Sequence, residues 1–437
     1  MIDEINRKIV VALTGDSMIS RLVPKTEDAW GIKQIIEQAD IRFTNCESLF
    51  HDYESFPLPR DNSNATMMYA RRDLVKELKF FGFNMVSLCN NHTMDYGQLG
   101  LNSTEQTLRD FEITFAGCGR DLYEAREPRY LETDKGRVAL LASCWAQFQG
   151  AWERAANMRS GIPARPGINL LKVESEYMVD TETFKHIKKV VSYFGKNPSE
   201  GNMESPNGDS LSLFHRKFRV GDKPKIVRKI NKEDYNDLML NVKDAKVNSD
   251  WVIVSFHVHD YDTKGPQFPA DFVRQYAHSC IDAGADVFVG HGPHMIQGIE
   301  IYKDKPIFYS LGNFIVHDLT VSKVTFDQYE SFNLGPQAKP SDFYKARYGI
   351  IPPSDPFKYK NWFQSIIPVL EIDGENLLGI KIIPIVMEEE NQRPIHQGNP
   401  KIAKGSRSKE IIEFLSDISA DWGTKITYED EIGKISL

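Results

Sequence analysis

The stretch DVFVGHGPHMIQGIEIYKDKPIFYSLGNFI, residues 286–315, decides both the fold and the chemistry that this chain can carry. A short apolar run at 287–289 is followed at once by GHGPH at 290–294. His291 and His294 can converge on one point, because glycine lets the backbone approach an ion and proline fixes the turn. Neutral imidazole is the commonest metal ligand, so the pattern indicates a divalent-metal site. The alternative is a pair of surface histidines on a loop.

Composition indicates a soluble globular protein. The 437 residues are 41% hydrophobic and 26% charged, which suffices for one large core or two ordinary ones. A formal charge of -8 gives no overall attraction to nucleic acid or to anionic membranes, so we expect neither as a partner. No apolar run is long enough to span a bilayer, and the first residues, MIDEINRKIVVALTGD, do not form a signal peptide.

Cysteine usage favours a cytoplasmic protein. The five cysteines are odd in number, widely spaced and mostly placed inside apolar runs, and they contain no CxxC pair. We interpret them as reduced core residues, which excludes a disulfide framework and argues against a cysteine-based zinc site. They are Cys46, Cys89, Cys118, Cys144 and Cys280.

Successive predicted strands each deliver polar side chains at their C-terminal ends. The β-branched run 8–14 leads to Asp16, and the run 41–44 leads to Asn45 and Glu47. The strand predicted at 84–89 is followed by NNHTMDYG, which contains Asn91, His92 and Asp95. Each is an ordinary turn residue when taken alone. Their recurrence indicates a site, since ligands bind outside the carboxyl ends of strands in layered α/β sheets.

A further strand, predicted at 251–256, ends in His257-Val258-His259-Asp260. Two histidines separated by one residue on an extended strand point the same way. Five of the 11 histidines fall between His257 and His294, which argues against a random scatter. His278, in the middle of a predicted helix, is interpreted as a bystander, and His186, His215 and His396 as ordinary surface residues.

The remaining apolar patterns predict an alternation of helices and strands. Helices are expected at 28–39, at 73–81, from a capping box at 103–106 to about residue 111, and at 181–194, 233–247, 269–283 and 408–418. Further strands are expected at 113–116, 137–142, 306–310, 366–372 and 377–383.

Two stretches interrupt this alternation. Over 146–248 the pattern loosens, so we predict an elaboration over the site within a single domain of residues 1–437, not a separate domain. A second, aromatic-rich insertion is predicted at 317–365.

Carboxylate, amide-oxygen and imidazole ligands from separate strands suit Mn, Zn, Fe or a similar divalent ion. There are enough candidate ligands for two ions about 3.5–4 Å apart, with Glu47 or Asp16 bridging them. The number of ions, one or two, is left open by the sequence.

The motifs, taken together, resemble the CapA family of poly-γ-glutamate capsule biosynthesis proteins, which are similar to calcineurin-like metallophosphoesterases. The resemblance extends from residue 9 to about residue 316. It rests on GD at 15–16, N-x-E at 45–47, NNHxxDYG at 90–97, the strand-end His257, GHxPH at 290–294 and YSLGNF at 309–314.

The resemblance implies an α/β fold, a four-layer α-β-β-α sandwich with insertions over the active-site edge. It also implies metal ligands at Asp16, Glu47, Asn91, His257 and His294, with His291 as a further ligand. His92 resembles the proton donor to a leaving group, or else a residue that orients Asn91, and Asp95 is expected to orient His92. Asn313 lines the site or caps a turn, and the turn is favoured.

This chain departs from the family's pattern at two places. The familiar HWGxE is HVHDY here, so the glutamate is absent and His259 is extra. The familiar GHHPH has Gly292 at its middle position, which removes one imidazole.

Three functions are compatible with these motifs. The first is a divalent-metal-dependent hydrolase of a γ-linked glutamyl or other acidic peptide, or of a phosphoester, with Arg154, Arg159 or Arg165 as carboxylate partners or as residues of a solvated loop. The second is a metal-independent peptide epimerase, in which His92 with Asp95 and His291 or His294 exchange a Cα proton. The third is a non-catalytic component that binds an acidic polymer. Oligomeric state is left open.

Overall fold

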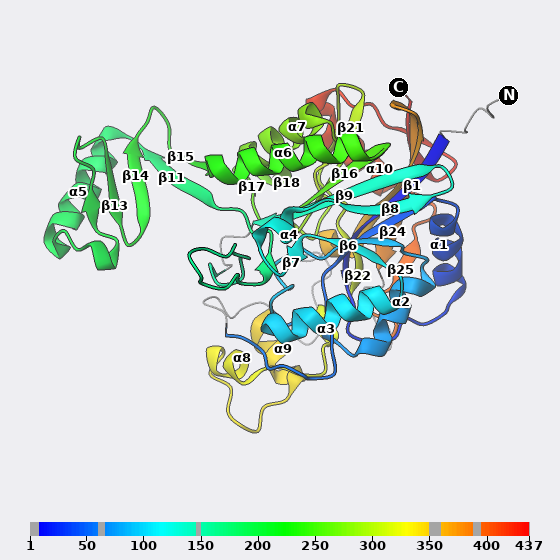
Figure 1. Ribbon diagram of the computed structural model, residues 1–437, viewed down its shortest axis with the longest axis horizontal. Coiled ribbons are helices and arrows are strands. Elements are labelled where there is room, and N and C mark those ends of the chain that lie inside the picture. The colour runs from blue at the N-terminus through cyan, green and yellow to red at the C-terminus, as the bar shows by residue number, and fades with distance from the viewer. Residues whose placement is uncertain (1–7, 60–65, 146–149, 349–359, 388–394, 437) are drawn as a thin grey trace. The chain divides into compact units, whose positions relative to one another are not determined.

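The computed structural model of the protein describes residues 8–59, 66–145, 150–348, 360–387 and 395–436 (Figure 1). The chain divides into two compact units. The first comprises Met1–Leu170 and Leu238–Leu437, and the second comprises Leu171–Asp237. The first unit carries every residue that the sequence marks as a candidate ligand or catalyst.

The larger sheet of the first unit has ten strands among the described residues. Its central strands β1, β2, β5 and β6 are parallel, β22 lies parallel to β1, and β23 is antiparallel to β1. The main path runs through β26 (Thr427–Glu429), β27 (Ile432–Ile435), β24 (Asn376–Met387), β23 (Gln364–Asp373), β1 (Lys8–Met18), β2 (Ile41–Cys46), β5 (Met85–Ser87) and β6 (Thr114–Ala116), with β22 (Asn313–Val316) beside β1 and β25 (Pro400–Ile402) beside β24.

The second sheet has six strands among the described residues, and its centre is also parallel. β9, β16, β19 and β21 run in one direction, whereas β8 and β20 are antiparallel edge strands. The order is β20 (Ile299–Tyr302), β21 (Lys305–Phe308), β19 (Val287–His291), β16 (Trp251–Val258), β9 (Gly136–Trp145) and β8 (Arg129–Thr133).

Helices lie on opposite sides of these strands. Figure 1 shows α6 and α7 on one side and α2 and α3 on the other. One continuous cluster of buried side chains takes members from both sheets, including Phe43 and Met85 from the larger sheet and Leu140 and Ile253 from the second. The helices of this unit include α1 (Glu27–Glu37), α2 (Val75–Phe80), α3 (Gly97–Asp110), α4 (Leu122–Arg126), α7 (Asp271–Ala283), α8 (Phe326–Ser331), α9 (Pro340–Tyr348) and α10 (Ser406–Ser419). Helix α6 (Lys232–Asn248) begins in the second unit and belongs to the first unit from Leu238 to its end. The expected α/β class is confirmed.

The second unit differs from the expected elaboration. It has its own five-stranded sheet in the order β12 (Met203–Glu204), β13 (Ser210–Leu213), β14 (Arg216–Val220), β11 (Val173–Val179) and β15 (Lys225–Ile230). Helix α5 (Thr181–Phe194) packs on it through Phe184 and Val191, which form a small separate core with Leu211. Because this core is its own, residues 171–237 form a compact unit, narrower than the insertion predicted at 146–248.

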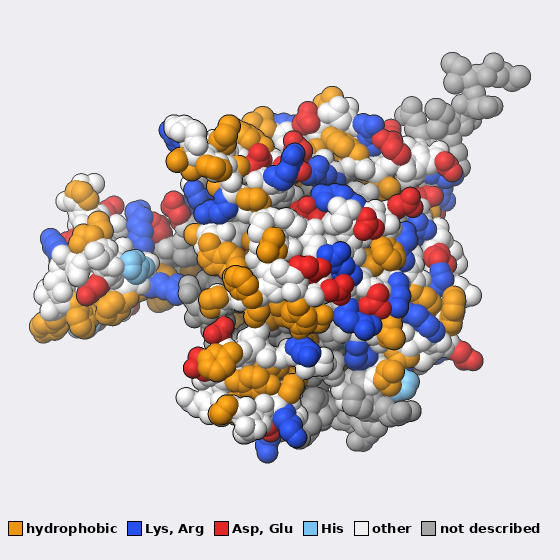
Figure 2. Space-filling model, turned by 60° about the horizontal axis from the view of Figure 1, so that its bottom comes forward, with side chains coloured by type: hydrophobic (Ala, Val, Ile, Leu, Met, Phe, Trp, Pro, Cys, Tyr) orange, Lys and Arg blue, Asp and Glu red, His pale blue; other side chains and the backbone are white. Residues whose placement is uncertain are grey.

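The surface of the second unit exposes large hydrophobic side chains. Tyr193, Phe194 and Phe214 are 73%, 56% and 55% exposed. In Figure 2 hydrophobic atoms gather along one edge of this unit, whereas on the first unit basic and acidic side chains are interspersed.

The second predicted insertion, 317–365, belongs to the first unit. It contains α8 and α9, and its residues 349–359 lie outside the described residues. Phe343 and Phe363 from this insertion share a buried cluster with Met18, at the end of β1, and with Met68.

One helix boundary was predicted wrongly. The capping box at 103–106 does not open a helix, because α3 already begins at Gly97. The Ser103 hydroxyl donates to the carbonyl oxygen of Phe50 at 3.0 Å, and the Thr104 hydroxyl accepts from the N–H of Phe50 at 2.8 Å. These side chains therefore join α3 to the short strand β3 (Leu49–Phe50) and are not available as caps.

Within the described residues, no helix combines the length and the apolar character that crossing a bilayer requires. All five cysteines are buried free thiols.

Candidate metal centre

Asp16 lies at the carboxyl end of β1, between two asparagines of neighbouring strands. The pairing registers place Asn45 of β2 on one side and Asn313 of β22 on the other. Gly15 allows this approach, since a Cβ there would lie 1.9 Å from the carbonyl oxygen of Gly312. The Asp16 carboxylate is fully buried and accepts from Asn45 Nδ2 at 2.8 Å and from the N–H of Gly292 at 3.3 Å. The larger sheet and the GHGPH turn therefore meet at Asp16.

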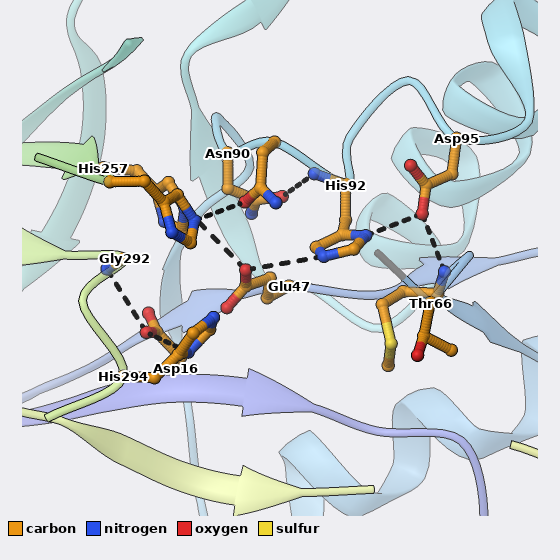
Figure 3. Close-up of polar contacts among 12 residues, drawn as sticks. Asp16, Glu47, Thr66, Asn90, His92, Asp95, His257, Gly292 and His294 are labelled. Carbon is orange, nitrogen blue, oxygen red and sulfur yellow. Dashed lines mark hydrogen bonds and ion pairs between the residues drawn. The ribbon is translucent and has the colours of Figure 1, made fainter. Parts of the chain in front are cut away.

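Glu47 occupies the middle of the site. Figure 3 shows its carboxylate between His257 and His92. Its Oε1 lies 3.7 Å from Nε2 of His257 and 3.9 Å from Nε2 of His92. The side chain is fully buried, yet neither carboxylate oxygen has a hydrogen-bond partner among the described residues. A buried carboxyl group without hydrogen-bond partners is costly, so the site is built around two oxygen atoms that the protein's own donors leave unsatisfied.

The second sheet contributes His257 and His291, which are paired across β16 and β19. His257 Nδ1 lies 3.2 Å from Asn45 Nδ2. His291 Nδ1 lies 3.3 Å from Oδ1 of Asp16, but it is poorly aligned, and both of its ring nitrogens lack hydrogen-bond partners among the described residues. Both imidazoles are fully buried.

His294 reaches the same carboxylate from the GHGPH turn. Its backbone has φ of +56°, and its Nδ1 lies 3.3 Å from Oδ2 of Asp16. Asn313 holds the ring through a 2.9 Å contact between its Oδ1 and the same Nδ1. Trp362, from the second insertion, packs against the ring with centroids 4.9 Å apart, and its carbonyl oxygen accepts from Asn313 Nδ2 at 3.0 Å. Asn313 therefore lines the site from within β22, which corrects the turn-capping role that was favoured for it.

The side chain of Asn91 contacts the histidines of the site at His259. The Asn91 Oδ1 lies 3.2 Å from Nε2 of His259, and that nitrogen lies 3.0 Å from Nε2 of His257. The preceding residue, Asn90, anchors the turn. Its side chain donates to the carbonyl oxygen of Cys46 at 2.8 Å and accepts from the N–H of His92 at 3.0 Å.

His92 and Asp95 form a buried pair at the rim of the site. His92 Nδ1 lies 2.7 Å from Oδ2 of Asp95, and the same oxygen accepts from the N–H of Met68 at 2.7 Å. The other ring nitrogen, Nε2, faces Glu47, as Figure 3 shows. Asp95 therefore orients the imidazole with one nitrogen turned into the site.

Charge in the site is unevenly shared between two buried carboxylates. Burial would raise the pKa of Asp16, but the imidazoles of His291 and His294 hold that pKa well below its usual value. Burial, and then the charge of Asp16, raise the pKa of Glu47 well above its usual value. Burial opposes protonation of His294, but Glu47 and Asp16 together raise its pKa to about 9.

Two other imidazoles, those of His257 and His259, are held neutral. Burial lowers the pKa of His257 and of His259 well below the usual value, and the neighbouring His257 lowers that of His259 further. Neutral imidazole is the form that binds a metal ion.

Comparison with known proteins identifies the family of this chain. A family described as bacterial capsule synthesis protein PGA_cap matches residues 10–318, which is more than half of the chain. The chain belongs to this capsule synthesis family. The resemblance to CapA, within the metallophosphoesterase superfamily, is thereby confirmed.

This chain is also similar in sequence to several curated proteins. Uncharacterized protein y4sH of Sinorhizobium fredii is 33% identical, over 97% of this chain and 92% of its own length. The capsule biosynthesis protein CapA of Bacillus anthracis is 25% identical, over 71% of this chain and 60% of its own length. A probable polyglutamine synthesis accessory protein of Mycobacterium tuberculosis is 26% identical, over 53% of this chain and 45% of its own length.

The residues of this family member fit a divalent cation. Two groups of side chains, all buried except the half-buried His259, have ligand atoms that all lie within 4.8 Å of one another, namely Asp16 with Glu47 and His257, and Glu47 with His259 and His294. A cation between them would meet the unpartnered oxygens of Glu47 and would offset the repulsion between the two carboxylates. The donor set of carboxylate and imidazole suits Zn, Mn or Fe.

The structure brings together every residue that the family resemblance implied. They are Asp16, Glu47, Asn91, His92, Asp95, His257, His291 and His294. Their roles as ligands and catalysts stay predictions. The three loop arginines are not part of this cluster. Arg154 and Arg165 donate to backbone carbonyls of their own segment, and Arg159 is exposed.

The sequence did not predict that Trp362 contacts the site, and it did not indicate the supporting functions of Asn45 and Asn313. Trp362 lies in an aromatic-rich insertion with no pattern that points to the site. Asn45 and Asn313 were visible at strand ends, but their functions as supports for Asp16 and His294 depend on strand pairing that no local motif reveals.

Proposed function

We propose that this chain is a divalent-metal-dependent hydrolase of the capsule synthesis family. The observation that carries the proposal is the fully buried Glu47 carboxylate, whose two oxygens have no hydrogen-bond partner in the described part of the chain. Histidine side chains, among them His257 and His92, lie beside it. Hydrogen bonds to water or protein satisfy nearly all buried polar groups in native proteins, so an unsatisfied carboxylate among histidines favours a cation as its partner.

The proposed ligands are Asp16, Glu47, Asn91, His257, His291 and His294, and the ion is Mn, Zn or Fe, with one or two per chain. When bound, such an ion supplies Lewis acidity toward a substrate oxygen and lowers the pKa of water. The chain's own residues hold the geometry. Asn45 and the N–H of Gly292 fix the Asp16 carboxylate, and Asn313 fixes the His294 ring.

His92 is the proposed proton donor to the leaving group. Its Nδ1 is engaged by Asp95, so that Nε2 is the nitrogen turned toward Glu47 and the site. The Asp95 carboxylate stabilises the protonated ring and keeps its orientation. A general acid at this position would protonate the leaving amine or alcohol, which the metal ligands of the site do not contact.

The proposed substrate is acidic, either a γ-linked glutamyl or similar peptide amide, or a phosphoester. The names of two relatives support a polymer as substrate, since one is a capsule biosynthesis protein and another a probable polyglutamine synthesis accessory protein. An acidic group would be repelled by Asp16 and Glu47 unless a cation stood between them, which links substrate class to metal. Arg159, whose side chain is exposed in the segment after β9, is a proposed partner for a substrate carboxylate.

We propose a four-layer α-β-β-α sandwich for the first unit. Two features support it. The core cluster contains side chains from both sheets, and helices lie on opposite outer sides of the strands. Ligands bind outside the carboxyl ends of strands in layered α/β sheets, and Asp16 and His257 lie near such ends of the two sheets here.

The test is hydrolysis followed in heavy water. Metal-loaded protein is incubated with γ-glutamyl peptides and with phosphomonoesters and diesters, and products are measured by mass spectrometry. Cleavage that requires added Mn²⁺ or Zn²⁺ and is lost in Asp16→Ala would agree with the proposal. Incorporation of deuterium at Cα without cleavage, unaffected by chelator, would replace it with the epimerase. Binding of poly-γ-glutamate with neither reaction would replace it with the non-catalytic function.

A further inference from the structure

We propose that His259 is a metal ligand, and that with Glu47 and His294 it forms a second ion-binding group beside that of Asp16, Glu47 and His257. This inference rests on the proposed metal dependence and adds a ligand that the family's motif does not contain. In the motif HWGxE a glycine stands where this chain has His259, and the glutamate position is Tyr261.

The end of β16 aims His259 at the site. The strand runs to Val258, and side chains two residues apart on an extended backbone point to the same side. His257 and His259 therefore both turn inward, with their Nε2 atoms 3.0 Å apart. The ring of His259 lies 5.3 Å from that of His294, centroid to centroid, so the two rings are neighbours.

Glu47 belongs to both ligand groups. In each group the ligand atoms lie within 4.8 Å of one another, a spread that one ion can bridge. Both Glu47 oxygens lack a partner among the described residues, so one oxygen is available to each ion. A shared carboxylate of this kind is the usual bridge in two-metal sites. His259 supplies the second of the two imidazoles in this group and its third ligand.

The two groups differ in chemistry. The first has two carboxylates and one imidazole, whereas the second has one carboxylate and two imidazoles, with the Asn91 Oδ1 3.2 Å from the His259 nitrogen. Imidazole suits Zn and Fe, and carboxylate suits Mn and Mg. We therefore expect the second group to prefer Zn²⁺ over Mn²⁺ more strongly than the first.

The competing explanation is that His259 only orients Asn91 through their 3.2 Å contact. The size of the loss in metal affinity on substitution of His259 distinguishes the two explanations. Residues that merely orient a ligand change metal affinity by about 10–100-fold, so loss of a direct ligand should exceed about 100-fold for one ion and leave the other nearly unchanged. Glutamine at position 259 keeps a hydrogen-bond donor for Asn91 and removes the imidazole.

The experiment compares wild type, His259→Gln and the exposed control His186→Gln. Each protein is stripped of metal and titrated with Zn²⁺ and with Mn²⁺ by calorimetry, and stoichiometry is read by native mass spectrometry. Circular dichroism and thermal unfolding of the metal-free proteins check that the fold is kept. Cobalt(II) loading gives a visible spectrum that reports a changed nitrogen ligand without any assay of activity.

The expected result is two zinc ions in wild type and in His186→Gln, and one in His259→Gln, with the second affinity lowered more than 100-fold. Equal stoichiometry and affinity in His259→Gln, with two ions or with one, would overturn the inference while leaving metal dependence intact. No bound metal in wild type would overturn both, and the two failures are therefore distinguishable.

Discussion

The imidazole of His92 is bound to Asp95 through a 2.7 Å contact between Nδ1 and Oδ2, and the same oxygen accepts the N–H of Met68 at 2.7 Å. The carboxylate is thus fixed from two sides. It holds the His92 ring with Nε2 directed toward Glu47, 3.9 Å away.

This arrangement predicts that His92→Gln lowers turnover by about 10²–10⁴-fold, because a positioned general acid contributes rate enhancement of that order. The loss should be small on a substrate whose leaving group needs no proton, such as a p-nitrophenyl ester, and large on an alkyl ester or amide. Metal content should stay at the wild-type level. Equal losses on both kinds of substrate would argue against proton donation.

A second prediction concerns the close approach of β19 and β21. A Cβ at Gly290 would lie 2.0 Å from the carbonyl oxygen of Tyr309, which is backbone and has no room to move. Gly290→Ala should therefore destabilise the fold by at least about 2 kcal/mol, as overpacking does, and should reduce metal binding along with it. Denaturant unfolding would measure this.

Gly335→Ala is the matched control, because a Cβ there meets nothing within 4 Å and the backbone does not have positive φ. Its free energy of unfolding should be unchanged or slightly higher. Similar destabilisation by both substitutions would contradict the close approach.

A third prediction concerns Asn313, which touches the ring and the carbonyl oxygen of His294. Asn313→Ala should weaken metal binding by about 10–100-fold without abolishing it, because the ligand itself remains. Asn399→Ala is the control, since Asn399 likewise contacts a buried histidine, His317, with 3.1 Å between Oδ1 and Nε2, but that histidine belongs to neither ligand group. Its metal affinity should equal that of wild type in the same calorimetric titration.

A fourth prediction concerns pH and lies away from the metal centre. Burial would raise the pKa of Glu300, but Arg274, Tyr309 and His278 lower it below the usual 4.5. A carboxylate with a lowered pKa contributes stability that is present above its unfolded pKa and is lost as pH falls through its folded pKa. Glu300→Gln should therefore cost about 3 kcal/mol at pH 7. The difference from wild type should shrink below about pH 4.5.

Urea unfolding of both proteins between pH 3 and 8 would measure it. A penalty independent of pH would mean that packing, and not charge, gives Glu300 its role. His278, interpreted from sequence as a bystander, belongs to this group, with its Nε2 3.0 Å from Oε1 of Glu300 and its ring stacked on Tyr302.

Much of the fold was predictable because its signals are local. Apolar β-branched runs predicted β1, β2 and β16 to within a few residues, and the helix predicted at 181–194 coincides with α5. The second unit was misjudged because its strands are short and half-exposed, so they lack the apolar runs that mark buried strands. The start of α3 was misplaced because Ser103 and Thr104 bond to another strand, which local sequence does not reveal.

The candidate site was predictable where polar residues end buried strands. Asp16, Glu47, His257 and His291 follow directly from that pattern. The supports could not be predicted, because they depend on which strands are neighbours. Asn313 stands beside Asp16 only because β22 pairs with β1, and Trp362 reaches His294 from an insertion without periodic pattern.

The most direct test of a cation-centred site is metal titration of the wild type and of Glu47→Gln, together with thermal unfolding of both in metal-free form. We expect Glu47→Gln to lower metal affinity more than 100-fold. The metal-free variant should unfold at the same temperature as wild type or higher, because a buried carboxyl group without hydrogen-bond partners and beside Asp16 is removed. Wild type that binds no divalent metal, or a Glu47→Gln variant that binds it equally well, would contradict a cation-centred site.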